Sequence, residues 1–355
     1  MKTFFLALCA IFVIPSLPAF AGENSIDEEH RQSVLLIAGY DGTIRAVSDV
    51  TPVNVDKGGI GDGIIDLRDV AELGVGAAFP PRLASYVSFT DLAVGGDGMI
   101  VASDITNKYL VLQDLFERRP DKQTWLLALK EESWSVLVRG ETVVYGMRYA
   151  PPGHAPYVIG YLEQDRTQSN FLINRVVASG DKSFPTACTA LESRVDGSVL
   201  CLDTPIGGPP RAGRLWLIPP DIRNPKGLGD PVMVYESPRL VSVTVNEDNQ
   251  VFVALKETER EGAKILRLTV DLRSRSVVGE PELIARGDLL NFDSEMANAM
   301  IAHEGNLYLG VDFFSNENFL QKAIVKVDPL TGDQSIYVTA DVVATSNPFA
   351  LAWWP

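Results

Sequence analysis

The chain has 355 residues, of which 46% are hydrophobic and 22% charged, and it contains 29 glycines and 22 prolines. This composition is typical of a globular protein with a substantial core and many turns, and it argues against a disordered chain. The formal net charge of −15 disfavours nucleic-acid binding, because an acidic surface repels phosphate backbones, whereas cations and basic partners are allowed. The acidity also fits a role in solubility alone.

Residues 1–21 predict a secretory signal peptide. Lys2 gives a positive start, Phe4–Ile14 is an apolar stretch, and Ala19-Phe20-Ala21 is a small-x-small cleavage site. We therefore expect the mature protein to begin at Gly22. Loss of Lys2, which is the only charged residue of this segment, moves the formal charge to −16.

Cys9 raises the alternative of a lipoprotein anchor, but Leu8 precedes it where a small residue is expected, and Cys9 lies inside the apolar stretch. No later segment approaches the roughly 18 consecutive apolar residues that a membrane helix needs. The sequence therefore predicts an exported periplasmic or extracellular protein without a membrane span.

After a polar lead at 22–32, the segment Ser33–Ser48 reads as a β-hairpin with its turn at Asp41-Gly42. The segment Leu92–Asp104 has the same form, because two short apolar runs flank Gly-Asp-Gly and glycine tolerates the positive φ of tight hairpin turns.

Comparable turns recur at Gly98, Gly140, Gly197, Asn249 and Gly305, and their separations of 42, 57, 52 and 56 residues each suit one four-stranded propeller blade. Five complete units of four short apolar runs can be traced. The expected strands are 92–94, 99–103, 109–112 and 124–129; 134–138, 142–147, 157–162 and 171–177; 188–191, 198–202, 214–218 and 232–235; 241–245, 250–255, 264–270 and 276–284; and 299–302, 306–311, 323–327 and 334–339.

The two ends of the chain supply a sixth unit. Asn347–Trp354 resembles an innermost strand without a partner after it, and Ser33–Ser48 resembles a second and third strand without a first. Pairing them closes the ring and protects the sheet edges. We therefore predict an all-β, six-bladed β-propeller over 33–355, closed by the terminal strands. The alternative is two stacked β-sandwich domains, although the middle of the chain has no Pro/Ser linker.

Residues 53–88 do not fit the repeat and predict the outer strand of the first blade plus an insertion with a short helix at Leu67–Leu73. Residues 56–73 resemble half of a dockerin-type, EF-hand-like calcium loop. In that comparison Asp62, Asp66 and Asp69 occupy the fifth, ninth and twelfth loop positions, which implies Ca²⁺ or another divalent cation. The first and third positions, Gly58 and Ile60, have no side-chain oxygen, so an Asp-Gly turn and a capped helix remain the alternative.

Cys188 and Cys201 flank the turn Arg194–Gly197. A hairpin closed there places both side chains on one face, directly opposed or one diagonal step apart, and export permits a disulfide. Such a bridge stabilises the fold by on the order of 3 kcal/mol. Two buried thiols are the alternative.

The hairpins Leu92–Asp104 and Ala302–Asp312 resemble those of the NHL-repeat and regucalcin/gluconolactonase-like group of six-bladed propellers. The resemblance implies that a divalent cation can sit at the centre of one propeller face, held by carboxylates and amides from several blades, where it polarises a lactone or ester carbonyl. Residues that occupy suitable blade positions are Asp91, Asp104, Asp203, Asp293, Glu295, Asn298, Asp312 and Asn347. Aspartates that end second strands are also common turn-capping residues.

Other catalytic sets are not visible. His30, His154 and His303 fall in the lead and in loops or turns, and the sequence has no Gly-x-Ser-x-Gly, P-loop or dinucleotide motif. It therefore predicts no organic cofactor and identifies no catalytic residue.

Aromatic and proline-rich loops at Tyr149–Tyr157, Pro205–Gly213 and Phe313–Phe319 favour binding of a protein, peptide or carbohydrate on one face. The leading hypothesis is thus an exported ligand- or protein-binding propeller. The alternative is a divalent-metal-dependent lactonase or esterase.

Overall fold

The computed structural model describes residues that all belong to one compact unit, Gln32–Pro355. Sequence predictions that fall between the ranges given next lie outside the described residues. The described ranges are 34–39, 44–48, 64–66, 89–95, 99–106, 108–114, 124–128, 132–139, 142–147, 157–164, 171–178, 185, 187–204, 212–221, 223–257, 261–287, 289–290, 299–314, 320–339 and 348–354.

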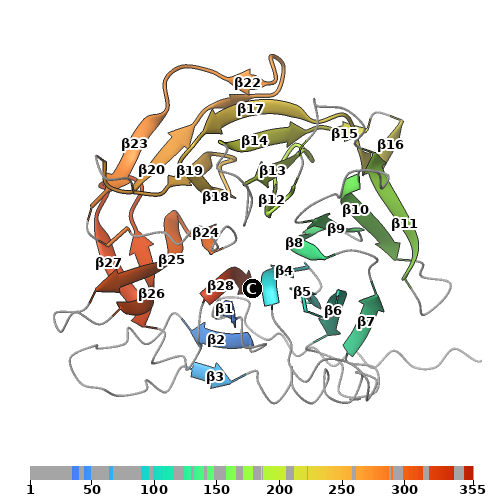
Figure 1. Ribbon diagram of the computed structural model, residues 1–355, viewed down its shortest axis with the longest axis horizontal. Helices are drawn as coiled ribbons and strands as arrows, with labels where there is room; N and C mark the ends of the chain where they lie inside the picture. Colours follow the sequence, from blue (N-terminus) through green and yellow to red (C-terminus); the bar gives the residue numbers. More distant parts are fainter. Residues whose placement is uncertain are drawn as a thin grey trace, which may run out of the picture. The chain divides into compact units, whose positions relative to one another are not determined.

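The strands of these ranges form six four-stranded antiparallel sheets and two two-stranded ribbons. We number the sheets in chain order, and Figure 1 shows them arranged around a common centre in the manner of a β-propeller. The first three sheets, listed from the innermost to the outermost strand, are β28 (Pro348–Trp354), β1 (Val34–Gly39), β2 (Ile44–Ser48) and β3 (Ile64–Asp66); β4 (Phe89–Val94), β5 (Met99–Asp104), β6 (Tyr109–Asp114) and β7 (Thr124–Ala128); and β8 (Ser133–Arg139), β9 (Thr142–Met147), β10 (Tyr157–Gln164) and β11 (Phe171–Ala178).

The other three sheets have the same plan. In the sequence, one ribbon falls between the third and fourth strands of the fourth sheet, and the other falls between the third and fourth strands of the fifth sheet. These elements are β12 (Ala190–Ser193), β13 (Val199–Asp203), β14 (Gly213–Ile218) and β17 (Val232–Ser237); β18 (Leu240–Val245), β19 (Val251–Leu255), β20 (Lys264–Leu268) and β23 (Glu282–Arg286); β24 (Met300–His303), β25 (Asn306–Phe314), β26 (Leu320–Val327) and β27 (Gln334–Thr339); and the ribbons β15 (Pro220–Asp221) with β16 (Asn224–Leu228) and β21 (Val270–Asp271) with β22 (Ser276–Val277).

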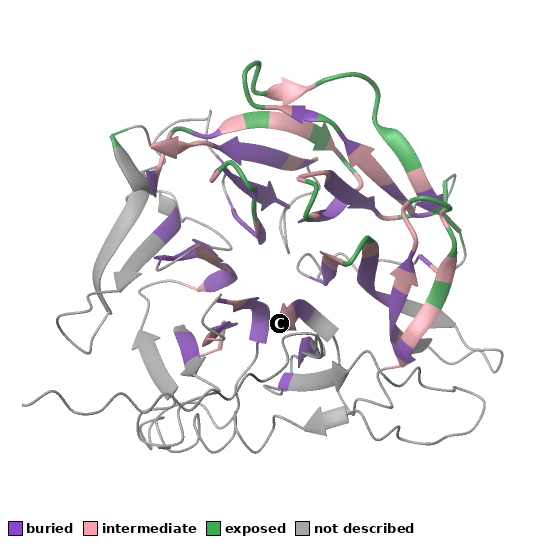
Figure 2. Cartoon of the chain, turned by 180° about the vertical axis from the view of Figure 1, so that it is seen from behind, coloured by how far each residue is buried: buried purple, intermediate pink, exposed green. Residues whose placement is uncertain are grey.

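Burial falls from the second strand of a sheet to its outermost strand, as Figure 2 shows for the fourth and fifth sheets. All five residues of β13 and of β19 are buried, whereas β17 and β23 each include exposed positions. A strand covered on both faces needs an apolar side chain at every position, which explains the continuous runs Val-Leu-Cys-Leu and Val-Phe-Val-Ala-Leu.

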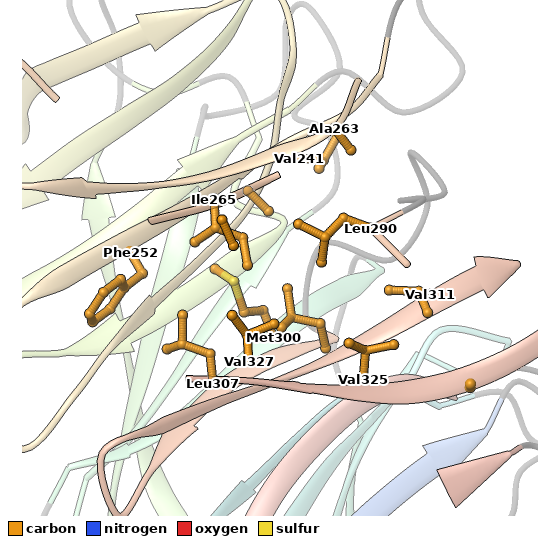
Figure 3. Packing of buried hydrophobic residues seen from close by; sticks show 14 residues of the cluster. Val241, Phe252, Ala263, Ile265, Leu290, Met300, Leu307, Val311, Val325 and Val327 are labelled. Carbon is orange, nitrogen blue, oxygen red and sulfur yellow. The ribbon is translucent and has the colours of Figure 1, made fainter. Parts of the chain in front are cut away.

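Each pair of neighbouring sheets is joined by its own cluster of buried apolar residues, and six such clusters occur among the described residues. The largest lies between the fifth and sixth sheets, where Phe252 and Ile265 of the fifth approach Leu307 and Val325 of the sixth (Figure 3). Hydrophobic packing between sheet faces therefore continues from each sheet to the next.

The terminal strands close this series. β28 pairs antiparallel with β1, with Leu36 opposite Ala352 and Ala38 opposite Ala350. Alternate side chains of the strand then serve two interfaces, because Leu36 packs toward the second sheet whereas Leu35 and Ile37 pack toward the sixth. The predicted pairing of the chain ends is confirmed.

Hairpin turns follow the predicted chemistry where they are described. Gly197 and Gly305 have φ of +80° and +75°, and Asn249, the non-glycine member of the series, has φ of 63°. Asparagine tolerates this left-handed conformation better than other side chains do. The turns at Asp41-Gly42, Gly98 and Gly140 lie outside the described residues.

Two expected strands are wrong in detail. Residues 264–270 and 276–284 each divide, so that β21 pairs with β22 as a ribbon and β23 alone forms the outer strand of the fifth sheet. The ribbon of β15 and β16 was not expected. In both cases the sequence stays β-forming after the sheet strand ends, so a local pattern cannot show where the partner changes.

The insertion contributes β3, which pairs with β2 through Arg45 opposite Asp66 and Val47 opposite Ile64. The outer strand of the first sheet is therefore Ile64–Asp66. The helix expected at Leu67–Leu73 lies outside the described residues.

Cys188 and Cys201 form a disulfide, with their Cα atoms 5.6 Å apart. The expected register is wrong, because Leu191 is the residue opposite Cys201 and β12 begins only at Ala190. The bridge thus ties the segment entering the fourth sheet to the second strand, and both cysteines are fully buried between the third and fourth sheets.

Reduction of this disulfide is expected to lower the free energy of unfolding by about 3 kcal/mol, because it frees a short loop in the unfolded chain. Urea denaturation with and without reductant measures the effect. A Cys188→Ala/Cys201→Ala variant is the control, and its stability should not respond to reductant. Equal stability of the wild type in both conditions would contradict the prediction.

Ring closure predicts a large cost for Leu351→Ala. Leu351 is 4% exposed and lies in the cluster between the sixth and first sheets, so the cavity left behind should cost about 2–5 kcal/mol. Leu330→Ala is the matched control, because Leu330 is 89% exposed and should change stability by less than about 0.5 kcal/mol. Chemical denaturation tests both, and similar losses would count against closure through β28.

Candidate functional site: an axial cavity

A cavity of about 220 Å³ lies where the innermost strands converge, and we call it the axial cavity. The innermost strand of every one of the six sheets contributes to its wall, namely β4, β8, β12, β18, β24 and β28. Figure 1 shows these strands nearest the common centre. A site at this position receives side chains from segments that span most of the chain.

Asp91 is the first ionisable residue of the axial cavity. It lies on β4, and its side chain accepts hydrogen bonds from two backbone N–H groups: Leu92 N at 2.8 Å to Oδ1 and Val136 N at 2.7 Å to Oδ2. Val136 belongs to β8, so this carboxyl joins the second sheet to the third. The residue is 5% exposed, and an N–H bonded to a carboxylate is a comparatively strong bond.

Glu192 on β12 is the second ionisable residue of this cavity, and its carboxyl is hydrogen-bonded to the side chain of Thr244. Thr244 lies on β18, and its Oγ1 in turn accepts a bond of 3.2 Å from the backbone N–H of Ala302 on β24. The hydroxyl therefore donates to Glu192 and accepts from Ala302, which links the fourth, fifth and sixth sheets through one side chain.

Serine side chains make comparable links elsewhere. Ser103 Oγ donates to Ser133 O at 2.8 Å, which joins the second sheet to the third, and Ser135 Oγ donates to Cys188 O at 2.8 Å, which joins the third to the segment entering the fourth. With Asp91, Glu192 and Thr244 they form a series of side-chain hydrogen bonds that runs from the second sheet to the sixth.

Burial raises the pKa of the Asp91 carboxyl well above its usual value, and the two backbone N–H bonds only partly oppose that shift. Burial also raises the pKa of Glu192, and the nearby charge of Asp91 adds to the effect while the Thr244 hydroxyl opposes it. The axial cavity therefore holds carboxyls that retain protons at a higher pH than exposed ones do.

The remaining residues of the wall are mostly apolar, such as Leu191, Val243 and Met300, but polar atoms make up the larger part of the surface exposed to the cavity. Trp353 of β28 also lines it. The Trp353 ring stacks on His303, with ring centroids 4.0 Å apart and an interplanar angle of 19°, and Tyr308 meets Trp353 edge-on at 5.1 Å. The indole Nε1 of Trp353 is buried and has no hydrogen-bond partner among the described residues.

Of the residues expected at a central metal site, the structure places Asp91 on the axial cavity. Asp104 and Asp203 are buried at the ends of β5 and β13 and do not line it. Asp104 Oδ1 accepts a bond from Thr106 N at 3.0 Å, which is a turn-capping contact. The side chain of Asp312 on β25, and all of Asp293, Glu295, Asn298 and Asn347, lie outside the described residues.

The second expected metal site is described only at Asp66, whose backbone belongs to β3. Asp62 and Asp69 lie outside the described residues, as does most of the three aromatic and proline-rich loops. Within the part of the chain that the structure describes, no group of three or more His, Cys, Asp or Glu side chains is placed to hold a metal ion. In the same residues, no helix is long and apolar enough to cross a membrane.

The sequence interpretation missed Glu192, Thr244 and Trp353. A signal for Glu192 does exist, since it is a lone charge in the run Thr189-Ala-Leu-Glu192 at the start of a unit. A charge on an innermost strand must face either a neighbouring sheet or the centre of the ring. The proximity of Glu192 to Asp91 follows only from closure of the ring.

No protein family model and no curated protein sequence matches the chain. Solved structures do match it. A structure of the nidogen/laminin complex has a TM-score of 0.59 and 10% identity over 91% of this chain and 98% of that one. A protein of unknown function from Bacteroides caccae has a TM-score of 0.51 and 14% identity over 91% and 99%. A putative 6-phosphogluconolactonase from Bacteroides uniformis has a TM-score of 0.50 and 10% identity over 91% and 100%. At such identities the likeness is one of fold alone, and the fold is that of a β-propeller.

The raised pKa of Glu192 predicts a pH-dependent effect on stability. The folded protein retains a proton that the unfolded chain releases near pH 4, so this group lowers stability progressively as pH rises from about 4 toward its folded pKa. Glu192→Gln should therefore gain stability relative to the wild type over that window, by up to about 1.4 kcal/mol for each pH unit.

Urea denaturation at several pH values from 4 to 8 measures this difference. Asp248→Asn, which removes an exposed carboxyl, is the control and should follow the wild type. A constant difference between Glu192→Gln and the wild type across the range would contradict the raised pKa.

Proposed function

We propose that this protein is an exported six-bladed β-propeller that acts as a binding module and takes a small ligand into the axial cavity. The observation that carries the proposal is that the innermost strands of all six described sheets line one cavity, and that two carboxyls from different sheets face it. Ligand sites are usually concave pockets in which a small number of polar groups converge.

The number of blades is supported by the strand pairing and the packing together. The described residues give six four-stranded sheets and six apolar clusters between neighbours, and β28 supplies the innermost strand of the sheet that begins the chain. Export is supported by the signal-peptide pattern of residues 1–21 and by the Cys188–Cys201 disulfide, because disulfides persist in oxidising compartments.

The second candidate is a divalent-metal-dependent lactonase or esterase on the same scaffold. It is favoured by the carboxyls of Asp91 and Glu192 at the axial cavity, since hard cations prefer oxygen ligands. It requires further ligands, and the sequence offers Asp293, Glu295, Asn298 and Asn347 before the last two innermost strands. Calcium held at Asp62 and Asp66 in the insertion is a separate proposal, which requires no turnover.

The test uses the mature protein from Gly22. A library of small compounds is screened by thermal shift against the wild type and Ser193→Trp, whose exposed side chain lines the axial cavity and would fill it. Ligands should stabilise the wild type and not Ser193→Trp. Val195→Trp, at a position that is 79% exposed on the adjoining turn, is the control and should respond as the wild type does.

Metal analysis and a lactone and aryl-ester screen with and without chelator distinguish the candidates. Stoichiometric metal with chelator-sensitive turnover would replace the binding proposal by the enzyme. Equal ligand responses of Ser193→Trp and the wild type would place binding outside the axial cavity and overturn the proposal. Loss of stability in chelator without turnover, abolished by Asp62→Ala/Asp66→Ala, would assign the metal to the insertion.

A further inference from the structure

The side chains of the axial cavity have one sign of charge. Asp91 and Glu192 are its two ionisable residues, and the described wall contains no lysine, arginine or histidine. The strands β8, β18 and β28 add no titratable group to it, and His303 at the end of β24 is near only through its stacking on Trp353. An anionic ligand would meet carboxyls without a compensating cation, so the charge favours a cation.

The oxygen atoms of this cavity are few for a metal ion. Both oxygens of Asp91 already accept backbone N–H bonds, at 2.8 and 2.7 Å, and Glu192 shares its carboxyl with Thr244. Calcium takes six to eight oxygen ligands and magnesium requires near-octahedral geometry. An ammonium group needs fewer acceptors, and it can share a carboxylate that also receives other donors.

Apolar residues also line the axial cavity. Leucine, valine, isoleucine, methionine and alanine are its most numerous residues, although more of the surface exposed to the cavity is polar than apolar, and Trp353 adds an aromatic ring. An alkyl or aryl group that contacts this ring gains by leaving water. The indole ring can also meet a cation directly, because aromatic faces attract ammonium groups.

The volume limits the size of this body. About 220 Å³ exceeds the cavity of about 150 Å³ that holds one benzene ring in another protein. It is below the range of about 300–1,000 Å³ for drug-sized ligands. One ring, or an aliphatic chain of similar volume, together with an ammonium group fits these limits.

We infer that the axial cavity binds a small organic ammonium ion, with the cation at Glu192 beside Asp91 and the rest of the ligand between the innermost strands. This inference rests on the proposed function and names the chemical class of its ligand. An acceptor atom on the ligand would also satisfy the buried Nε1 of Trp353. Binding of a cation favours the ionised carboxyl, so protons should be released and affinity should increase from pH 5 to pH 8.

Three probes of matched size test the inference by isothermal titration calorimetry on the mature protein: benzylammonium, benzyl alcohol and benzoate. Benzylammonium should bind at least tenfold more tightly than the other two. Glu192→Gln keeps an acceptor for Thr244 but removes the charge, and it should weaken benzylammonium binding at least tenfold. Asp248→Asn removes an exposed charge and should leave the affinity unchanged. Ser193→Trp should abolish binding of all three.

Several results would overturn the inference. Binding of benzyl alcohol or benzoate as tight as that of benzylammonium would overturn it. Unchanged binding of benzylammonium by Glu192→Gln would do the same. Binding of Ca²⁺ alone with loss in Glu192→Gln, or no binding of benzylammonium, would also reject it. The proposed function is judged separately, because library ligands that stabilise the wild type and not Ser193→Trp would preserve the binding module while the ammonium class failed.

Discussion

The inner edge of each sheet imposes the constraint on which the rest of the structure depends. An innermost strand pairs on one side only, so backbone groups on its other side need partners that no further strand supplies. Side chains supply some of them: Asp91 accepts from Val136 N, and Thr244 accepts from Ala302 N. Polar residues on these strands therefore join neighbouring sheets before they serve any ligand.

This structural use shapes the chemistry of the axial cavity. Each oxygen of the Asp91 carboxyl accepts one backbone N–H bond, so the position of this carboxyl is fixed and both of its oxygens already have a donor. Glu192 is held through a hydroxyl that is itself bonded to another strand, which leaves it better able to meet a ligand. The two carboxyls differ in role for this reason, although both titrate at raised pKa.

Much of the fold could be predicted from the sequence because it rests on local signals. Apolar runs located β5, β9 and β27, and the unpaired runs at the two ends predicted the pairing of β1 with β28. The ribbon of β21 and β22 could not be predicted, since a change of partner leaves no mark on a β-forming run. Asp91 was among the expected site residues, but Glu192 was not, because residues a hundred positions apart approach each other only through the curvature of the complete ring.

The pairing of β1 with β28 also has a consequence for the order in which the protein is made. The first sheet receives its innermost strand from residues 348–354, so it stays incomplete until nearly the whole chain has been synthesised. Closing so long a loop is entropically costly and is typical of slow-folding topologies. A chain that cannot complete its ring early therefore stays open during translation.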